Sequence, residues 1–513
     1  MPRMKTLLHL TLATVLTLPL AAADAYLPVK SPAPSSATAR QALLASFPQD
    51  ARQVVYRWDP RDARPEAERL RALAAFVYES YDSSAWIPQS FITVNRVLLG
   101  SSSAVDSILR DQLGLVLWPQ NHTAPVFGMA PNPARDQSLS WTLNCLACHM
   151  AEIDGVAYFG AGTKTLDELW LGRAAQKVTE LTHQTAARTA SPEQATARRA
   201  HDILRQHHHE VFEPLTRGRS TAFPASHVEM HMRAHGGNLP DFAKVGRGDV
   251  KSPPLWHAAA KAPFQRWYCD GSFTGTFPLM ASSMELALDQ SFDKLAASVV
   301  PQIQADFRNV IQFLRPPRYP HTIDAHAAAR GKKLFESEQI GCASCHGTYD
   351  GQGNVQWTGL HTDVGTDPAR LQLVNADFVT AFQASPLAQV GKLAPSRGYA
   401  ATPLTGVWAN FPYLHNGSVP TLYHLLGPVS ARPRLFSVQA ARHFDRVKVG
   451  QALHAPSAAA APEDEAELLR RHGEDRDWFN ANRTGCDNGG HDFWSRIKTE
   501  ENRMDLIEYL KTL

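Results

Sequence analysis

Two five-residue stretches contain the residue types best suited to chemistry, and both have the same pattern. Residues 145–149 read CLACH and residues 342–346 read CASCH, so each is a C-x-x-C-H motif. Chance is a poor explanation for two copies, because the 513 residues include only six cysteines. C-x-x-C-H is typical of c-type haem attachment, in which two thioethers hold the porphyrin and the histidine binds the iron. The sequence therefore predicts two covalently attached haems, with His149 and His346 as proximal ligands.

Two other uses of paired cysteines are the alternatives. A structural zinc would need two further ligands near each motif, and neither copy offers a second Cys or His pair at that spacing. A redox dithiol is expected in a βαβ setting, which the sequence around residue 145 does not suggest. We therefore expect Cys145 and Cys148 to bind one haem, and Cys342 and Cys345 to bind the other.

The beginning of the chain has the features of a secretory signal peptide. Arg3 and Lys5 precede a mostly apolar run over residues 7–20, and small residues follow at 21–25. A membrane anchor is the alternative, but the run is short for a bilayer span. We expect a periplasmic or secreted protein without stable membrane insertion. A net charge of +2 gives no reason to expect a nucleic-acid partner.

Two amphipathic stretches should position the second motif. One lies directly before the motif, around residues 326–336, and the other closes the chain at residues 500–513. Their apolar faces comprise Gly331, Leu334 and Phe335 in the first stretch, and Leu506, Ile507, Leu510 and Leu513 in the second. A helix before the motif and a closing helix with a tyrosine, here Tyr509, resemble the cytochrome c fold. Gly331 would let the two helices approach closely.

The chain divides into four segments in this interpretation. A signal peptide (1–25) and an N-terminal extension (26–125), with a helix in residues 65–81, precede a first cytochrome c-like haem domain (126–315). The Pro-rich stretch 315–322 leads into the second (316–513), in which residues 452–468 look like an inserted surface loop. The predicted fold class is mainly α, with two tandem cytochrome c-type haem domains and long irregular loops. A Pro-Leu pair with a tryptophan nearby follows each motif, at Pro254-Leu255-Trp256 and at Pro403-Leu404 with Trp408.

Other histidines and cysteines are weaker candidates. His207, His208 and His209 are consecutive, so a helix would point them in different directions. His227, His231 and His235 would share a helix face, where a solvated polar stripe is the simpler interpretation. The remaining cysteines, Cys269 and Cys486, either form a disulfide or are buried as small residues.

The stretch GVWANFPYLHNGSVPTL, residues 406–422, resembles the bacterial di-haem cytochrome c peroxidase superfamily, which includes MauG and the rubber oxygenases. The tail from residue 485 is more similar to the rubber oxygenases and the related di-haem fatty-acid dioxygenases. The resemblance covers roughly residues 120–513, although the chain is shorter than the rubber oxygenases.

This resemblance implies different surroundings for the two irons. His491 would be the distal ligand of the second iron, and His415 would contact a haem propionate or another group beside the haem. A bis-histidine iron is closed and suits electron storage. No Gly-His follows in the first domain, so its iron would be open or weakly ligated, with Met280 and Met284 as alternative ligands. An open iron could react with O2 or H2O2. The resemblance places Trp256 and Phe273 in its distal pocket as catalytic residues, and plain core packing is the alternative.

The predicted function is that of a periplasmic di-haem oxidoreductase. Its first haem would activate O2 or H2O2 and its second would relay electrons. A dioxygenase acting on an unsaturated apolar substrate is slightly favoured. One alternative is a peroxidase that takes electrons from a small periplasmic cytochrome. The others are an electron-transfer protein without substrate chemistry and a binding module that keeps haem as a structural core.

Overall fold

The computed structural model describes most of the chain from residue 35 onwards. The described ranges are 35–81, 86–88, 106–118, 122–124, 126–132, 139–168, 215–221, 248–286, 295–384, 386–389, 391–454 and 464–513. The predicted signal peptide and the histidines at 207–209, 227, 231 and 235 lie outside them, as does most of the predicted surface loop at 452–468. Within these ranges, no helix has both the length and the apolar character needed to cross a bilayer.

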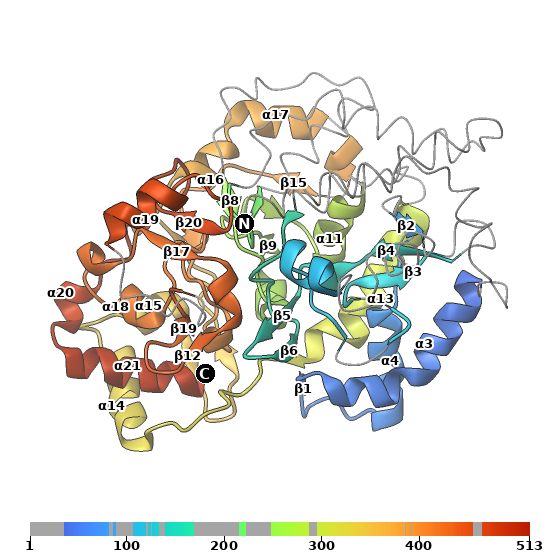
Figure 1. Ribbon diagram of the computed structural model, residues 1–513, viewed down its shortest axis with the longest axis horizontal. Helices are drawn as coiled ribbons and strands as arrows, with labels where there is room; N and C mark the ends of the chain where they lie inside the picture. The colour runs from blue at the N-terminus through green and yellow to red at the C-terminus, as the bar shows by residue number, and fades with distance from the viewer. Residues whose placement is uncertain are drawn as a thin grey trace.

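Helices are the largest regular elements (Figure 1). The longer ones are α3 (Ser36–Asp50), α4 (Glu66–Val77), α11 (Phe277–Leu286), α13 (Val300–Asn309), α14 (Ala325–Glu336), α17 (Ala376–Ala384), α19 (Glu465–His472) and α21 (Glu500–Thr512). Helices of four or five residues are α10 (Ala258–Lys261), α15 (Cys342–His346), α16 (Ala369–Leu373), α18 (Leu422–Leu426) and α20 (Trp494–Ile497). The helix expected within residues 65–81 is confirmed as α4.

The strands are two to four residues long and form small antiparallel sheets of two or three strands. The two-stranded sheets pair β1 (Arg57–Trp58) with β11 (Leu314–Arg315), β5 (Met150–Ile153) with β6 (Val156–Phe159), β7 (Ser220–Thr221) with β8 (Asp249–Val250), β12 (Thr348–Tyr349) with β13 (Val355–Gln356), β14 (His361–Thr362) with β16 (Tyr399–Ala400), β17 (Leu435–Ser437) with β20 (Trp478–Asn480), and β18 (Phe444–Asp445) with β19 (Gly450–Gln451). The three-stranded sheets are β2 (Trp86–Pro88), β4 (Ser140–Leu143) and β3 (Met129–Pro131), and β15 (Lys392–Leu393), β10 (Phe273–Thr274) and β9 (Arg266–Trp267).

Helices α14 and α21 lie side by side, and α14 also contacts α15, the helix of the second motif (Figure 1). A Cβ atom on Gly331 would lie 1.9 Å from the carbonyl oxygen of Asp505, so only glycine permits this approach. Phe335 packs against Tyr509 with ring centroids 5.3 Å apart, and Arg330 forms an ion pair with Asp505 at 2.6 Å. The predicted helix pair and the role of Gly331 are confirmed.

The first motif lies beside a looser pair of helices, α4 and α13. Tyr81, just after α4, donates a hydrogen bond to Asp306 of α13 at 2.7 Å. The side-chain amide of Asn144, next to the motif, donates to the carbonyl oxygens of Val77 and Glu79, both at 2.9 Å. These contacts join residues on both sides of the predicted boundary at 125/126, so α4 packs with the first motif.

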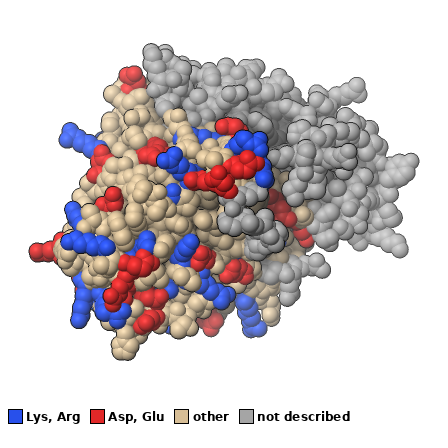
Figure 2. All heavy atoms as spheres, turned by 60° about the vertical axis from the view of Figure 1, so that its left-hand side comes forward, with Lys and Arg blue, Asp and Glu red and all other residues tan. Residues whose placement is uncertain are grey.

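The two halves of the chain share one hydrophobic core. Strand β10 from the first half pairs with β15 from the second, and residues as distant in sequence as Trp141 and Trp408 belong to the same buried cluster. On the face shown in Figure 2, acidic and basic side chains are interspersed. Two tandem cytochrome c domains remain a prediction; the contacts show that the halves pack together as one body.

Candidate functional site

The first motif is held by a capped turn. Residues Cys145–Ala147 form a short 3-10 helix, and the preceding Asn144 accepts a hydrogen bond from the Leu146 amide at 3.0 Å. Asn144 is a favoured helix cap because its side-chain oxygen can replace the missing backbone acceptor. Since its amide group also bonds to the chain after α4, Asn144 fixes the motif against that segment.

The second motif forms its own short helix, α15. Gly341 before it and Gly347 after it have φ angles of +80° and +81°, a conformation that favours glycine. A Cβ atom on Gly347 would lie 2.1 Å from the carbonyl oxygen of Gln356, so the chain also passes closely there. These two turns direct His346 back toward the body of the protein.

The two motif histidines bond in the same way. The Nδ1 atom of His149 lies 2.8 Å from the carbonyl oxygen of Pro253, and the Nδ1 atom of His346 lies 2.8 Å from that of Thr402. A carbonyl can only accept, so Nδ1 carries the proton and Nε2 keeps a free lone pair. Burial lowers the pKa of His149 to about 4 and also lowers the pKa of His346. Both rings are therefore neutral near pH 7 and have Nε2 available to bind a metal.

The motif cysteines form no disulfide within the described residues. Burial raises the pKa of the Cys148 thiol above its usual range and that of Cys342 to about 12. Reactive dithiols depend on a lowered thiol pKa, so these surroundings do not favour a redox dithiol. Thioether attachment of haem requires cysteines that are outside disulfides.

His491 faces His346. Their ring centroids lie 6.2 Å apart, with 62° between the ring planes. Two imidazoles bound on opposite sides of one metal, each with a bond of about 2 Å, would have centroids about 6 Å apart. The Nδ1 atom of His491 is buried without a hydrogen-bond partner, and burial, then His346 and Arg432, lower its pKa to about 3. The spacing of the pair therefore fits two histidines that would hold one haem iron between them.

Arg432 fixes the loop that carries His491. Its guanidinium donates to the carbonyl oxygens of Asn488 at 2.5 Å, of Gly490 at 2.8 Å and of His491 at 3.3 Å. His491 itself has a φ of +47°, and a Cβ atom on Gly490 would lie 2.2 Å from the carbonyl carbon of Gly365. The loop is therefore held in one strained conformation. Sequence analysis missed Arg432, because it lies 59 residues before His491.

His415 has different surroundings from His491. Its ring stacks on Tyr399, with centroids 3.8 Å apart and 14° between the planes. Burial, followed by the positive charges of Arg370 and Lys251, lowers its pKa to about 3. The Ala400 amide, next to Tyr399, donates to the carbonyl oxygen of Cys269 at 2.7 Å. His415 thus lies where the two halves meet, and its contact with a haem propionate stays a prediction.

Trp256 and Phe273 are buried, with 4% and 1% of their surfaces exposed. The indole nitrogen of Trp256 donates to the carbonyl oxygen of Thr405 at 3.0 Å, and its ring packs against Gly160. Phe273 packs so closely on Gly391 that a Cβ atom there would lie 2.1 Å from the ring. These contacts are those of core residues joining the two halves, and the role of both in a distal pocket stays a prediction.

The remaining candidates are placed as follows. Cys269 and Cys486 are both free, so the disulfide alternative is wrong in this structure, and only Cys486 is fully buried. Met280 is partly buried against the hydrophobic core, whereas the side chain of Met284 lies outside the described residues.

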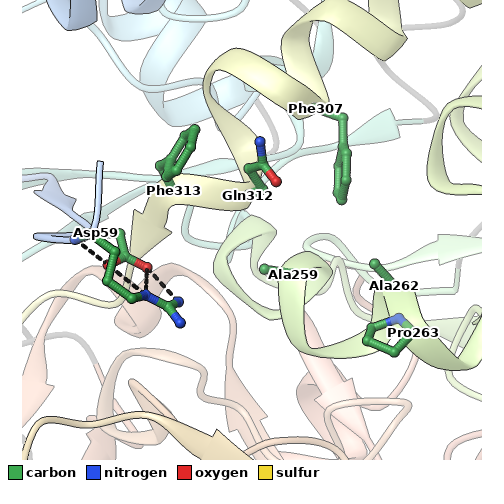
Figure 3. Close-up of a pocket in the computed structure, with 8 residues that line it drawn as sticks. Asp59, Ala259, Ala262, Pro263, Phe307, Gln312 and Phe313 are labelled. Atoms are coloured by element: carbon green, nitrogen blue, oxygen red, sulfur yellow. Dashed lines mark hydrogen bonds and ion pairs between the residues drawn. The ribbon is translucent and has the colours of Figure 1, made fainter. Parts of the chain in front are cut away.

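Figure 3 shows a pocket of about 460 Å³. Its lining residues are Asp59, Arg61, Ala259, Ala262, Pro263, Phe307, Gln312 and Phe313. Asp59 and Arg61 pair with each other at 2.7 Å on one side of it. Since no residue of either motif lines this pocket, it is not part of the candidate site.

Comparison with known proteins identifies one part of the site. Residues 398–437 match a family described as RoxA-like, cytochrome c-like. This segment contains Thr402, His415 and Arg432, and a cytochrome c-like segment is a mark of proteins that bind c-type haem.

Two curated relatives come from Sinorhizobium fredii (strain NBRC 101917 / NGR234), and both are described as uncharacterized proteins. The chain is 31% identical to y4iM over 316 residues, which cover 53% of this chain and 66% of that protein. It is 26% identical to y4iJ over 305 residues, which cover 46% of this chain and 47% of that protein. The chain thus spans about two thirds or less of these relatives. The comparisons support a c-type haem protein of the oxidoreductase kind at this coarse level.

Proposed function

We propose that this chain is a periplasmic di-haem c-type cytochrome oxidoreductase. The first haem, at Cys145, Cys148 and His149, activates O2 or H2O2, and the second, at Cys342, Cys345 and His346, relays electrons. The observation that carries the proposal is an asymmetry between the two histidines. His346 faces His491 at 6.2 Å, whereas within the described residues no second imidazole faces His149.

The residues of this chain have distinct tasks in this proposal. The haem, when bound, supplies the redox chemistry. The carbonyl groups of Pro253 and Thr402 orient the two proximal histidines and keep their Nε2 atoms unprotonated. Arg432 holds His491 in place, so His491 would be positioned to bind the second iron together with His346. The haem held there would supply electron transfer.

A carbon monoxide titration tests the proposal. The protein would be expressed with c-type haem maturation, fully reduced and titrated while the Soret band is followed. We expect one CO per two haems, because only the first iron has an open position. If no CO binds, both irons are capped by protein ligands, and an electron-transfer protein without substrate chemistry replaces the enzyme. If two CO molecules bind, the role of His491 is wrong.

A dioxygenase acting on an unsaturated apolar substrate is our preferred activity, on the basis of the sequence resemblance. One structural observation favours the peroxidase alternative. Burial raises the pKa of Asp306 to about 7, and Asp306 bonds to Tyr81, whose hydroxyl lies 3.7 Å from the Cys145 sulfur. A group that holds a proton near neutral pH could assist peroxide cleavage.

Turnover assays separate the two activities. The reduced protein supplied with O2 and a polyunsaturated fatty acid should consume O2 without external electrons if it is a dioxygenase. With H2O2 and a reduced small cytochrome c, a peroxidase would oxidise the cytochrome instead. Oxidation of the cytochrome without oxygenation of the lipid would contradict our preference.

A further inference from the structure

Three cationic side chains from the first half converge on one loop of the second half. This loop, residues 409–417, is called the junction loop below. Lys164 donates to the carbonyl oxygen of Ala409 at 2.7 Å. Lys251 donates to that of Pro412 at 2.7 Å and also bonds to Asn410. Arg219 donates to the carbonyl oxygens of Asn416 at 2.6 Å and Gly417 at 2.7 Å. Lys164, Lys251 and Arg219 form the cation cluster.

The cation cluster lies between the two motifs. Lys164 follows Thr163, whose amide donates to the carbonyl oxygen of Cys148 at 2.8 Å. Lys251 comes two residues before Pro253, the acceptor for His149. On the other side, the junction loop begins seven residues after Thr402, the acceptor for His346. The cations are thus anchored by their neighbours to the first motif and reach the chain that supports the second.

The charge in this cluster lacks compensation among the described residues. The charged neighbours that shift the pKa of Lys164 and Lys251 are other cations of the cluster, and no carboxylate is among them. Burial, together with this repulsion, lowers the pKa of Lys164 well below its usual range and that of Lys251 to about 7. Only Arg219 has an acid nearby, Asp249. Buried charges are normally paired, because leaving them uncompensated costs several kcal/mol.

Lys164 also has donors to spare. Its ammonium group carries three N–H bonds, but among the residues that the structure describes it has one acceptor, the Ala409 carbonyl oxygen. Its remaining close contact is with the ring of Phe411, 4.7 Å from the ring centre. By contrast Lys511, another buried lysine, pairs with Glu508 at 2.5 Å. An anion placed beside Lys164 would therefore find free donors there, in surroundings where the neighbouring charged groups are cations.

We propose that the cation cluster binds the propionate carboxylates of a haem, at the junction between the two motifs. The proposal rests on the proposed function, since it requires the haems to be attached. The cluster then does more than hold the junction loop: its positive charge is paired by the cofactor itself, and it raises the reduction potential of the haem that it touches.

Reduction potentials of the haem-loaded full-length protein test this. Lys164→Met and Lys251→Met each remove a positive charge with little change in volume. Because ferric haem carries one more positive charge than ferrous haem, either variant should favour the ferric state. We expect at least about a tenfold fall in the equilibrium constant for reduction of one haem, which is about 59 mV for a one-electron couple. Lys511→Met is the matched control and should leave both potentials unchanged.

Three further measurements make the outcomes decisive. Lys164→Arg keeps the charge and should restore the wild-type potential, which separates an electrostatic role from damage to the fold. Unchanged potentials in both Lys→Met variants, with full haem content, would overturn the proposal and leave the cations as supports of the loop. The reduction potentials of the wild-type protein should not change when acetate is added. A shift would also overturn the proposal, because the cation cluster would then be open to a carboxylate from solution and not filled by a haem propionate. The proposed enzyme activity is judged separately, by CO binding and turnover.

Discussion

The two C-x-x-C-H segments are alike in the hydrogen bond that holds each motif histidine, and they differ in the residues near that histidine. His149 and His346 each bond through Nδ1 to a backbone carbonyl at 2.8 Å, and in each case a proline follows the acceptor residue. Opposite His346 stands His491, held by Arg432. Near the first motif lie instead a tyrosine and a carboxylic acid, Tyr81 and Asp306.

This comparison suggests how one architecture could provide two different haem sites. In each segment the acceptor of the histidine Nδ1–H is a backbone carbonyl oxygen. This hydrogen bond therefore does not depend on which side chain the acceptor residue carries. In the proposed arrangement the distal side depends on one loop, where His491 would close the second site. We infer that the first site differs by lacking such a loop in the described chain, not by having a different proximal side.

Removing one pair of cysteines at a time tests the comparison most severely. Cys145→Ser with Cys148→Ser should abolish covalent attachment of the first haem only, and Cys342→Ser with Cys345→Ser that of the second. Each double variant should lose half of the covalent haem, because thioethers form only with the cysteine sulfurs. Pyridine haemochrome spectra and intact mass measure the haem content. A double variant that kept the wild-type content would show that its motif is not an attachment site.

Removing His491 should make the second site resemble the first. His491→Ala leaves the second iron without its distal ligand, so the reduced protein should bind two CO per molecule where the wild type binds one. CO titration of the Soret band measures this. The pH is not critical, because burial keeps the pKa of His491 at about 3, and the ring is neutral near pH 7.

His415→Ala is the matched control. It removes a buried histidine of the same domain that stacks on Tyr399 and does not face His346. We expect its CO stoichiometry to stay at the wild-type value. If His415→Ala raises the stoichiometry and His491→Ala does not, the distal ligand has been assigned to the wrong histidine.

The sequence predicts those features whose residues have a characteristic spacing along the chain. The two motifs and the helix pair crossing at Gly331 could be predicted in this way. His491 is singled out only through the family resemblance, and its role as an iron ligand stays a prediction. The acceptors at Pro253 and Thr402 are backbone atoms and leave only a faint signal, the Pro-Leu pairs after each motif. Arg432 and the cation cluster could not be predicted, because they act on carbonyl groups from 56 to 245 residues away. Such contacts depend on the tertiary fold and not on local pattern.

The acid beside the first motif should make stability depend on pH. Burial raises the pKa of Asp306 to about 7 from an ordinary value of about 3.9. The folded state therefore binds this proton more tightly than the unfolded state. The stability from this group is fully present below about pH 4 and is lost as the pH rises through about 7, at up to about 1.4 kcal/mol per pH unit.

Asp306→Asn removes the titrating carboxyl and leaves an amide oxygen to accept from Tyr81. Thermal unfolding midpoints measured across this pH range should therefore fall less steeply in the variant than in the wild type. Equal slopes would mean that the carboxyl is ionised in the folded protein, and the case for a proton donor near the first motif would be lost.

The smallest expected effect concerns the helix pair that distinguishes the second half. Gly331→Ala places a methyl group 1.9 Å from the carbonyl oxygen of Asp505, so α14 and α21 must separate. Overpacking of this kind costs about 1–3 kcal/mol, which a lowered unfolding midpoint would report. Gly351→Ala is the matched control, because its new Cβ would meet nothing within 4 Å, and we expect a change within about 0.5 kcal/mol. Since α14 leads into the second motif, the Gly331 variant should also broaden the absorption of the second haem while that of the first stays the same. Equal stability of the two variants would show that the helices can separate at no cost, and that their close crossing does not position His346.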